Sequence, residues 1–319
     1  MTGGATPADS ASPAYTQLLS QCGVRPPSTD DPATALALVR QFGACLITAP
    51  ASAPAATGRS AAAGVAQERW SAERLAASRG AQVFGSSKVL ACPPPIMIDR
   101  TYFQAGDRDF LVHSDATDYG HHIPDFILFT AEAAADTGGE TFLVDSYAML
   151  AALSAEPSTA WLPSALRRVV IDAVQPDTGQ GCTRPVVTQT AGRVAVCRPA
   201  SSDAMPAAQT LRPLQEQDAA AQRMLEQFHA ACDAAAAMAP RFKLQPGETV
   251  VLDNFRVFHG REPFLGDQRK LWRTWIWSDE GSGPPLGGVA GSFVDPGQNE
   301  NVASGGVRPA SGDVNRPNL

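Results

Sequence analysis

The sequence places a histidine and an aspartate one residue apart, at His113 and Asp115. In an extended segment, alternate side chains point to the same face, so the imidazole and the carboxylate would lie side by side. Two histidines and one carboxylate on one face of a metal ion leave three coordination positions open, as in non-haem Fe(II) oxygenases. A pair with this spacing also arises by chance, for example at a polar strand end. The pair therefore predicts a metal site only if a second histidine joins it.

Four other histidines could complete such a site: His121, His122, His229 and His259. His229 falls inside a long predicted helix, where an ordinary amphipathic position explains it equally well. His121 and His122 are adjacent in a predicted loop and very close to His113 in the sequence, so they are more readily pocket-lining residues. His259 follows an apolar strand and a tight turn and precedes a glycine. That position would direct its side chain into a cavity.

Short apolar segments that read as strands surround these residues. The predicted strands are 44–48, 126–130, 141–144, 169–171, 194–196, 249–252 and 272–277. Helical spacing is found at 32–42, 68–77, 146–154, 160–168 and 214–238. Three prolines at 93–95 are expected to break any regular element. Strands on both sides of the long helix at 214–238 predict one mainly β domain with helical decoration.

The two ends of the sequence differ in composition from its middle. Residues 1–14 are small and polar, and we expect them to be disordered. Residues 281–319 are rich in Gly, Pro, Asn and Ser, which predicts a tail or a loose cover. A single domain is therefore expected over residues 15–280, with the long helix as an insertion.

The bulk composition argues against several classes of partner. The net charge is -7, and there is no basic run that would attract nucleic acid or an anionic membrane. We find neither a bilayer-spanning apolar window nor a signal peptide, and the six cysteines form no CxxC pair. These features predict a cytoplasmic protein without a nucleic-acid or membrane partner. A homo-oligomer is compatible with them.

Four segments, in this order, resemble the taurine dioxygenase family and its relative γ-butyrobetaine hydroxylase. They are HSD at 113–115, GGET at 138–141, DNFRVFHGR at 253–261 and RKLWR at 269–273. The resemblance spans roughly residues 110–279, and the segment at 33–48 also looks like the opening of the family. Residues 50–90 and the segment after 281 do not contribute to it.

The resemblance implies a double-stranded β-helix (jelly-roll) core, with Fe(II), 2-oxoglutarate and O2 as cofactor and cosubstrates. His113, Asp115 and His259 match the iron ligands, which are also the catalytic residues. Arg269 matches the arginine that pairs with the far carboxylate of 2-oxoglutarate, and Thr141 matches the hydroxyl that assists it. A planar guanidinium can hold a carboxylate with two parallel hydrogen bonds, which suits this role.

The resemblance is less specific about the substrate. In several family members the equivalent of Arg273 holds an anionic group of the substrate, although a strand would place it on the same face as Arg269, where it could share the cosubstrate site. The segment after the iron motif offers further polar groups, which could equally form a solvated loop. The substrate-binding residues are predicted to be Arg273, Asp118, Tyr119, His121 and His122. An amino acid or another small zwitterion would suit Asp118 for its amine and Arg273 for its carboxylate.

The predicted activity is oxidation, above all hydroxylation, of a small polar molecule with release of succinate and CO2. The carboxylate of Asp115 favours hydroxylation over halogenation, because related halogenases have a small residue at this position. Desaturation, cyclisation or epoxidation of a natural-product intermediate in specialised metabolism uses the same cofactors and stays open. A zinc hydrolase and a non-catalytic metal- or ligand-binding β-barrel protein are the alternatives of other classes.

Overall fold

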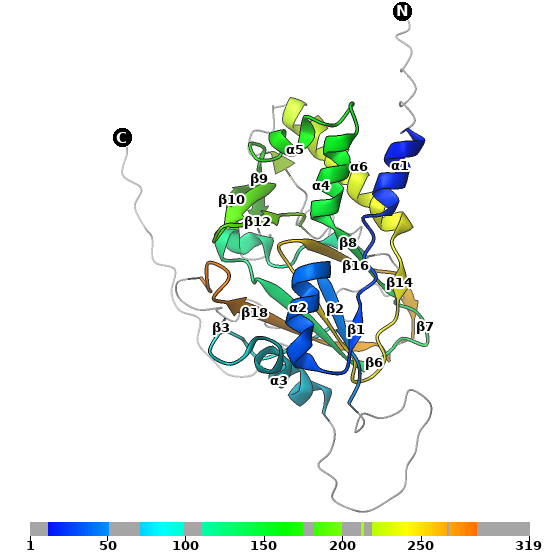
Figure 1. Cartoon of the computed structure of the whole chain (residues 1–319), viewed down its shortest axis with the longest axis vertical. Coiled ribbons are helices and arrows are strands. Elements are labelled where there is room, and N and C mark those ends of the chain that lie inside the picture. The colour runs from blue at the N-terminus through cyan, green and yellow to red at the C-terminus, as the bar shows by residue number, and fades with distance from the viewer. Residues whose placement is uncertain are drawn as a thin grey trace, which may run out of the picture.

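The computed structural model describes residues 12–50, 71–98, 110–174, 181–199, 212–213, 219–266 and 268–285. Two facing β-sheets form its centre (Figure 1). Helices α1, α4, α5 and α6 gather at one end of the molecule, and α2 and α3 lie at the other (Figure 1). No helix in the described part of the chain is long and apolar enough to cross a bilayer.

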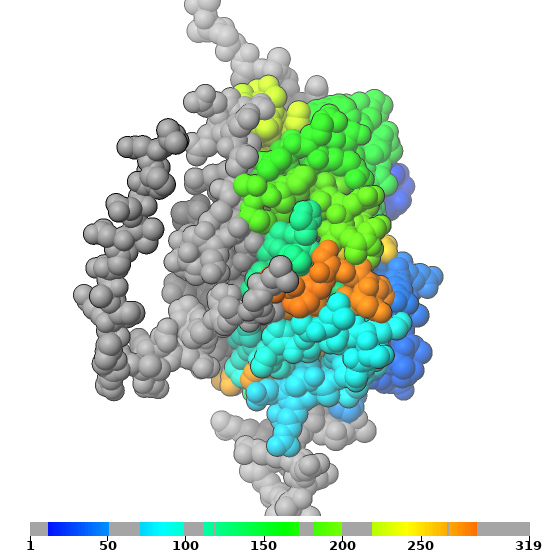
Figure 2. Space-filling model, turned by 90° about the vertical axis from the view of Figure 1, so that its left-hand side faces the viewer, coloured from blue at the N-terminus to red at the C-terminus, as the bar shows by residue number. Residues whose placement is uncertain are grey.

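The larger sheet has seven strands in the order β1-β2-β15-β6-β18-β3, with β4 also paired to β18. The strands are β1 (Ser28–Thr29), β2 (Ala44–Ile47), β3 (Val89–Ala91), β4 (Ile96–Ile98), β6 (Phe126–Ala133), β15 (Thr249–Asp253) and β18 (Lys270–Ser278). All neighbours are antiparallel except β1 and β2. Figure 2 shows the orange end of the described chain beside the cyan segment that contains β3 and β4.

The smaller sheet has four strands in the order β14-β8-β16-β5. They are β5 (Phe110–His113), β8 (Thr141–Asp145), β14 (Arg241–Phe242) and β16 (Val257–Arg261). Along the chain, β5, β8 and β16 alternate with β6, β15 and β18 of the larger sheet. This alternation between two facing sheets is a double-stranded β-helix, so the predicted jelly-roll core is confirmed.

The two faces of the smaller sheet have different neighbours. Val112, Val144 and Phe258 point to one face, where they pack with Leu225 and Phe228 of α6. Because side chains alternate along a strand, the residues next to Val112 and Phe258 point to the other face. Those residues are His113 and His259, so burial of the apolar positions under α6 turns both histidines toward the larger sheet.

The larger sheet is buried on both faces. Leu128, Val251 and Ile276 face α2 and α3, while Phe129 and Leu271 face the interior between the sheets. The covering helices are α1 (Pro13–Ser20), α2 (Pro32–Phe42), α3 (Ala72–Phe84), α4 (Ser146–Ala155), α5 (Leu162–Ala165) and α6 (Ala219–Met238). The remaining elements are η1 (Thr117–His122), β7 (Thr137–Gly138), β9 (Val170–Val174), β10 (Gly181–Pro185), β11 (Val187–Thr190), β12 (Arg193–Val196), β13 (Arg212–Pro213) and β17 (Phe264–Leu265).

Local signals set most of the helix ends. The carboxylate of Asp31 accepts a hydrogen bond from the amide of Ala33 at the start of α2, and Gly43 ends it in a left-handed conformation (φ 82°). Asp145 caps α4 in the same way, through the amides of Tyr147 and Ala148. These residues explain why α2 and α4 begin where the sequence predicts.

Several expectations need correction. Helix α1 begins at Pro13, inside the segment expected to be disordered, and its N-cap is Ser12. The break expected at the prolines 93–95 is present, because they lie between β3 and β4, but these two strands, which both pair with β18, were not predicted. The helix predicted at 68–77 spans Ala72–Phe84, and the one predicted at 160–168 is only Leu162–Ala165. Residues 1–11, 214–218 and 286–319 lie outside the described residues.

Candidate active site

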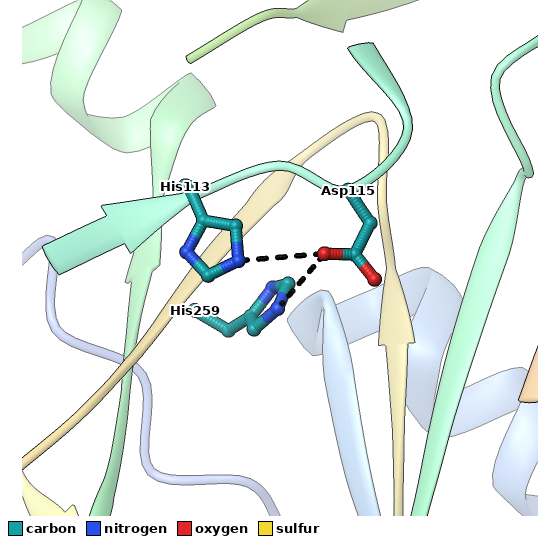
Figure 3. A group of neighbouring side chains, drawn as sticks. All are labelled: His113, Asp115 and His259. Atoms are coloured by element: carbon teal, nitrogen blue, oxygen red, sulfur yellow. Dashed lines mark ion pairs between the residues drawn. The ribbon is translucent and has the colours of Figure 1, made fainter. Parts of the chain in front are cut away.

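His113, Asp115 and His259 form a buried cluster between the two sheets. Each offers one ligand atom, and these atoms all lie within 4.8 Å of one another. Oδ1 of Asp115 lies 3.4 Å from Nε2 of His113 and 3.5 Å from Nε2 of His259 (Figure 3). The two histidines are direct partners in the register of β16 and β5, so the sheet itself fixes their spacing.

The two imidazoles present their Nε2 atoms to the cluster. Nδ1 of His113 lies 2.9 Å from the backbone oxygen of Leu111, so in the neutral ring Nδ1 carries the proton and Nε2 keeps its lone pair. Burial, and then the charge of His113, lower the pKa of His259 to about 4. His259 is therefore neutral near pH 7, the form that binds a metal.

Asp115 is held at both its backbone and its side chain. Its amide donates to Oδ1 of Asn254 (3.0 Å), and Nδ2 of Asn254 donates to its backbone oxygen (3.1 Å). Its other carboxylate oxygen, Oδ2, accepts one hydrogen bond from Nη1 of Arg273 and one from Nε1 of Trp275, both at 2.9 Å. Burial raises the pKa of Asp115, but the charge of Arg273 and the bonds to the two histidines outweigh it and hold the pKa well below its usual range.

This donor set fits a divalent transition metal. One carboxylate oxygen and two imidazole nitrogens converge, which suits Fe(II) or Zn(II). Nδ1 of His113 donates to the backbone oxygen of Leu111, and Arg273 and Trp275 donate to Oδ2 of Asp115, so these hydrogen bonds engage the ligand atoms that face away from the centre, an arrangement that orients metal ligands. Three ligands on one side leave the cleft side open to other molecules.

A cleft opens beside the cluster, and the empty space within it and at its mouth is about 500 Å³. Its floor is apolar, with Ile98, Phe129 and Leu271, and three arginines reach it. The full lining is Ile98, His113, Asp115, Phe129, Thr141, His259, Gly260, Arg261, Arg269, Leu271 and Arg273. Three cationic side chains and one carboxylate make this a cleft for anions.

Arg269 and Thr141 approach the same end of the cleft from different sheets. Arg269 is 7% exposed, and no carboxylate among the described residues lies within ion-pair distance of it. Burial, and then the charge of Arg261, lower the pKa of Arg269 to about 9, so it remains a cation at pH 7. Thr141 begins β8 and is also buried. A buried cation without an acidic partner among the described residues is suited to pair with an anionic ligand.

Gly138 and Gly139 make room for this arrangement. A Cβ on Gly138 would lie 2.0 Å from the backbone oxygen of Pro263, and one on Gly139 would lie 3.2 Å from Cδ of Arg269. Both glycines have φ 75°, which other residues rarely adopt. The paired glycines thus let the segment before Thr141 approach Arg269 closely.

Three of the other predicted substrate residues, Tyr119, His121 and His122, are absent from the lining of the cleft. Tyr119 packs edge-on against Trp275 and Trp277, with ring centroids 6.1 and 6.4 Å apart. His121 is exposed, and Nδ1 of His122 lies 3.1 Å from the backbone oxygen of Gly283. The side chain of Asp118 lies outside the described residues.

His229, considered as a second histidine ligand, instead belongs to α6. It lies behind the smaller sheet, beside Phe228, and burial lowers its pKa to about 4. Two residues of the site were not expected from the sequence, Asn254 and Trp275. Asn254 lies within the third resembling segment, and Trp275 is the next residue after Arg269, Leu271 and Arg273 on the same face of β18. The two-residue period of β18 could have revealed Trp275.

Comparisons with known proteins agree with this site. Residues 22–275 match the model of the family described as "Taurine catabolism dioxygenase TauD, TfdA family". No curated protein gives a significant match. Solved structures with a similar fold include asparagine oxygenase in complex with Fe(II), 3-hydroxyasparagine and succinate, with 20% identity, coverage of 82% of this chain and 88% of that chain, and a TM-score of 0.46.

Two further structures resemble the chain to a similar degree. The non-haem iron oxygenase OrfP in complex with Fe has 15% identity, coverage of 86% of this chain and 94% of that chain, and a TM-score of 0.48. PvcB from Pseudomonas aeruginosa has 16% identity, coverage of 75% and 77%, and a TM-score of 0.44. Structural similarity at this level does not identify the family, so the assignment rests on the match to the family model. That match covers most of the sequence, and the chain therefore belongs to the TauD/TfdA family and is an Fe(II)- and 2-oxoglutarate-dependent dioxygenase.

Proposed function

We propose that His113, Asp115 and His259 hold the iron, that Arg269 and Thr141 hold 2-oxoglutarate, and that the enzyme hydroxylates a small polar substrate. The observation that carries this proposal is the buried Arg269, which has no acidic partner among the described residues and lines the same cleft as the three ligands. A dicarboxylate could bind the metal with one end and pair with Arg269 through its other end.

Each group of residues has a separate task. When bound, Fe(II) and 2-oxoglutarate supply the reduction of O2, coupled to conversion of 2-oxoglutarate into succinate and CO2. The neutral imidazoles and Asp115 fix the position of the metal. Arg269 orients the far carboxylate through charge-assisted hydrogen bonds, assisted by the hydroxyl of Thr141. Ile98, Phe129 and Leu271 keep this part of the cleft apolar, which strengthens those bonds.

The substrate class follows from the charge of the rest of the cleft. Arg261 and Arg273 line it in addition to Arg269, and Arg273 is also paired with Asp115. A substrate with a carboxylate or another anionic group suits these guanidinium groups. An amino acid or another small zwitterion is our proposed substrate, with Arg273 nearest its anionic group and Asp118 a candidate for its amine.

The test is succinate formation by anaerobically purified protein supplied with Fe(II), 2-oxoglutarate and air. The panel consists of amino acids, each paired with the amine that lacks its carboxylate. We expect one amino acid to stimulate succinate formation and its amine partner to fail. Stimulation by the amine alone would contradict the zwitterion proposal. Absence of succinate, together with no visible charge-transfer band from Fe(II) and 2-oxoglutarate, would contradict the assigned roles of the site residues.

A further inference from the structure

The two oxygens of Asp115 have different surroundings. Oδ1 faces Nε2 of both histidines, at 3.4 and 3.5 Å. Oδ2 accepts hydrogen bonds from Nε1 of Trp275 and Nη1 of Arg273, each at 2.9 Å. Asp115 is only 6% exposed, so water does not compete strongly for Oδ2. One oxygen is therefore directed to the metal position, and the other is engaged by β18.

The two donors to Oδ2 are held rigidly. Trp275 and Arg273 lie two residues apart on β18, which pairs with β6 along its length and with β4 beside Arg273. Trp275 packs edge-on against Trp277 (6.1 Å, 87°), and the guanidinium of Arg273 lies 4.5 Å from the centre of the Trp275 ring. The backbone of Asp115 is fixed independently by Asn254. Rotation of the carboxylate would break both hydrogen bonds to Oδ2. Because Asn254 fixes the backbone of Asp115, the backbone cannot move to restore them.

We infer that Trp275, with Arg273, keeps Asp115 as a one-oxygen metal ligand. This inference rests on the proposed iron site. Three protein donors leave three positions of an octahedron, of which the keto acid chelate needs two. If Oδ2 turned toward the metal it would occupy one of these three. The indole N–H is a neutral donor without an acceptor function, so it holds Oδ2 at any pH at which Asp115 is ionised.

Trp277 provides a matched control on the same strand. It is buried like Trp275, contacts Tyr119 edge-on in the same way, and donates its Nε1–H to the backbone oxygen of His122 (2.8 Å). Trp275→Phe and Trp277→Phe therefore each remove one buried indole donor from neighbouring positions. Only the first removes a donor to Asp115.

The experiment measures metal and cosubstrate binding separately. Co(II) is titrated into each protein, because its visible spectrum reports the coordination number, and 2-oxoglutarate is then titrated into the metal-saturated protein without O2. We expect Trp275→Phe to change the Co(II) spectrum, and to weaken 2-oxoglutarate binding about tenfold because Oδ2 then competes with the keto acid chelate for a metal position. The affinity for Co(II) should not fall, and Trp277→Phe should match the unaltered protein.

Two results would overturn the inference while leaving the iron site intact. One is a Trp275→Phe protein whose spectrum and 2-oxoglutarate affinity equal those of the unaltered protein. The other is a loss of Co(II) affinity with unchanged 2-oxoglutarate binding to the saturated protein, which would mean that Trp275 only orients Asp115. Failure of the unaltered protein to bind Co(II) would instead contradict the proposed metal site, and with it the inference.

A measurement on the unaltered protein covers the case in which Trp275→Phe does not fold. The chain has five tryptophans, so five indole N–H signals are expected in a 15N spectrum of the Zn(II)-loaded protein. We expect the assigned signal of Trp275 to remain protected from solvent exchange after Zn(II) binds. Exchange as fast as that of Trp161, which is 46% exposed, would show that Oδ2 has left the indole and would overturn the inference.

Discussion

The two sheets that enclose the cleft contribute different chemistry to it. The smaller sheet supplies the two imidazoles, from the paired positions His113 and His259. The larger sheet supplies Arg273 from β18, and Arg269 immediately precedes that strand. Both imidazoles thus come from one wall of the cavity, whereas groups that can bind an anion come from both walls, since Thr141 and Arg261 lie on the smaller sheet. Asp115 joins the two walls through its hydrogen bond from Arg273. Substitution of Arg269 should therefore affect anion binding without removing a metal donor.

The largest effect on activity is expected when a proposed metal ligand is removed from the smaller sheet. His259→Ala should abolish Fe(II) binding and all succinate formation, because two donors in a buried cluster do not define a site. Metal content after reconstitution and succinate formation measure this. His229→Gln, a histidine substitution behind the same sheet, is the control and should retain both. Full activity of His259→Ala would remove the smaller sheet from the metal site.

On the side of the larger sheet, the corresponding substitution is Arg269→Met. It should raise the KM for 2-oxoglutarate by about 100-fold, because about 3 kcal/mol of charge-assisted hydrogen bonding is lost. Fe(II) binding should remain unchanged. The neighbour Lys270, which is partly exposed and lies 3.9 Å from Glu132, provides Lys270→Met as the control. An equal loss of metal and cosubstrate binding in Arg269→Met would show that the two walls are not independent.

A smaller effect on cosubstrate binding is expected at Gly139, where the segment before Thr141 approaches Arg269 on the other wall of the cleft. Gly139→Ala should cost about 1–2 kcal/mol of unfolding free energy for its positive φ, and should also weaken 2-oxoglutarate binding by displacing Arg269. Gly192→Ala is the control, because Gly192 has φ 81° but nothing within 4 Å of the added Cβ. It should lose similar stability with no change in KM. Thermal unfolding and the KM for 2-oxoglutarate separate the two effects.

The smallest expected effect lies outside both walls, at His229 in α6. Its pKa is lowered to about 4 by burial and by the charge of Arg198, whereas the unfolded chain titrates near 6.5. The folded state binds fewer protons between these values, so stability present above pH 6.5 is lost as the pH falls to about 4. The loss should be about 1–3 kcal/mol.

His229→Gln should reduce that part of the pH dependence. Chemical unfolding at pH 7.5 and pH 4.5, for the unaltered protein and the variant, measures it. Identical pH profiles for the two proteins would exclude His229 as the source. Because His229 lies behind the smaller sheet, the same two proteins also show whether a change in α6 affects the sheet that carries His113 and His259.

Much of the fold followed from local patterns in the sequence. The helix at 32–42 has an aspartate cap and a terminal glycine, and the apolar runs at 126–130 and 249–252 are too short for helices. Strands β3 and β4, on either side of the prolines at 93–95, were not predicted, because their pairing with β18 is nonlocal. Helix α1 was also missed, since its stability comes from packing of Tyr15 and Leu19 in the core beside α4 and α6.

The site was predictable where residues lie on strands and less so where they lie in turns. Alternation placed Arg269 and Arg273 on one face, but only the three-dimensional structure shows Arg273 bonded to Asp115. Tyr119, His121 and His122 were expected near the substrate because they follow the iron motif. The turn at Gly120 (φ 64°) separates the last two from the motif, and they end outside the cleft lining. Sequence proximity does not determine side-chain direction in such a turn.

The hydrogen bonds between Asp115 and Asn254 join positions 139 residues apart. During synthesis of the chain, the segment from Phe110 to Asp115 must therefore leave the ribosome long before its partners exist. At the site that we propose, the metal can gain its third protein ligand only after His259 has been synthesised. Long-range closure of this kind slows folding. Iron loading at this site should therefore follow the synthesis of β16.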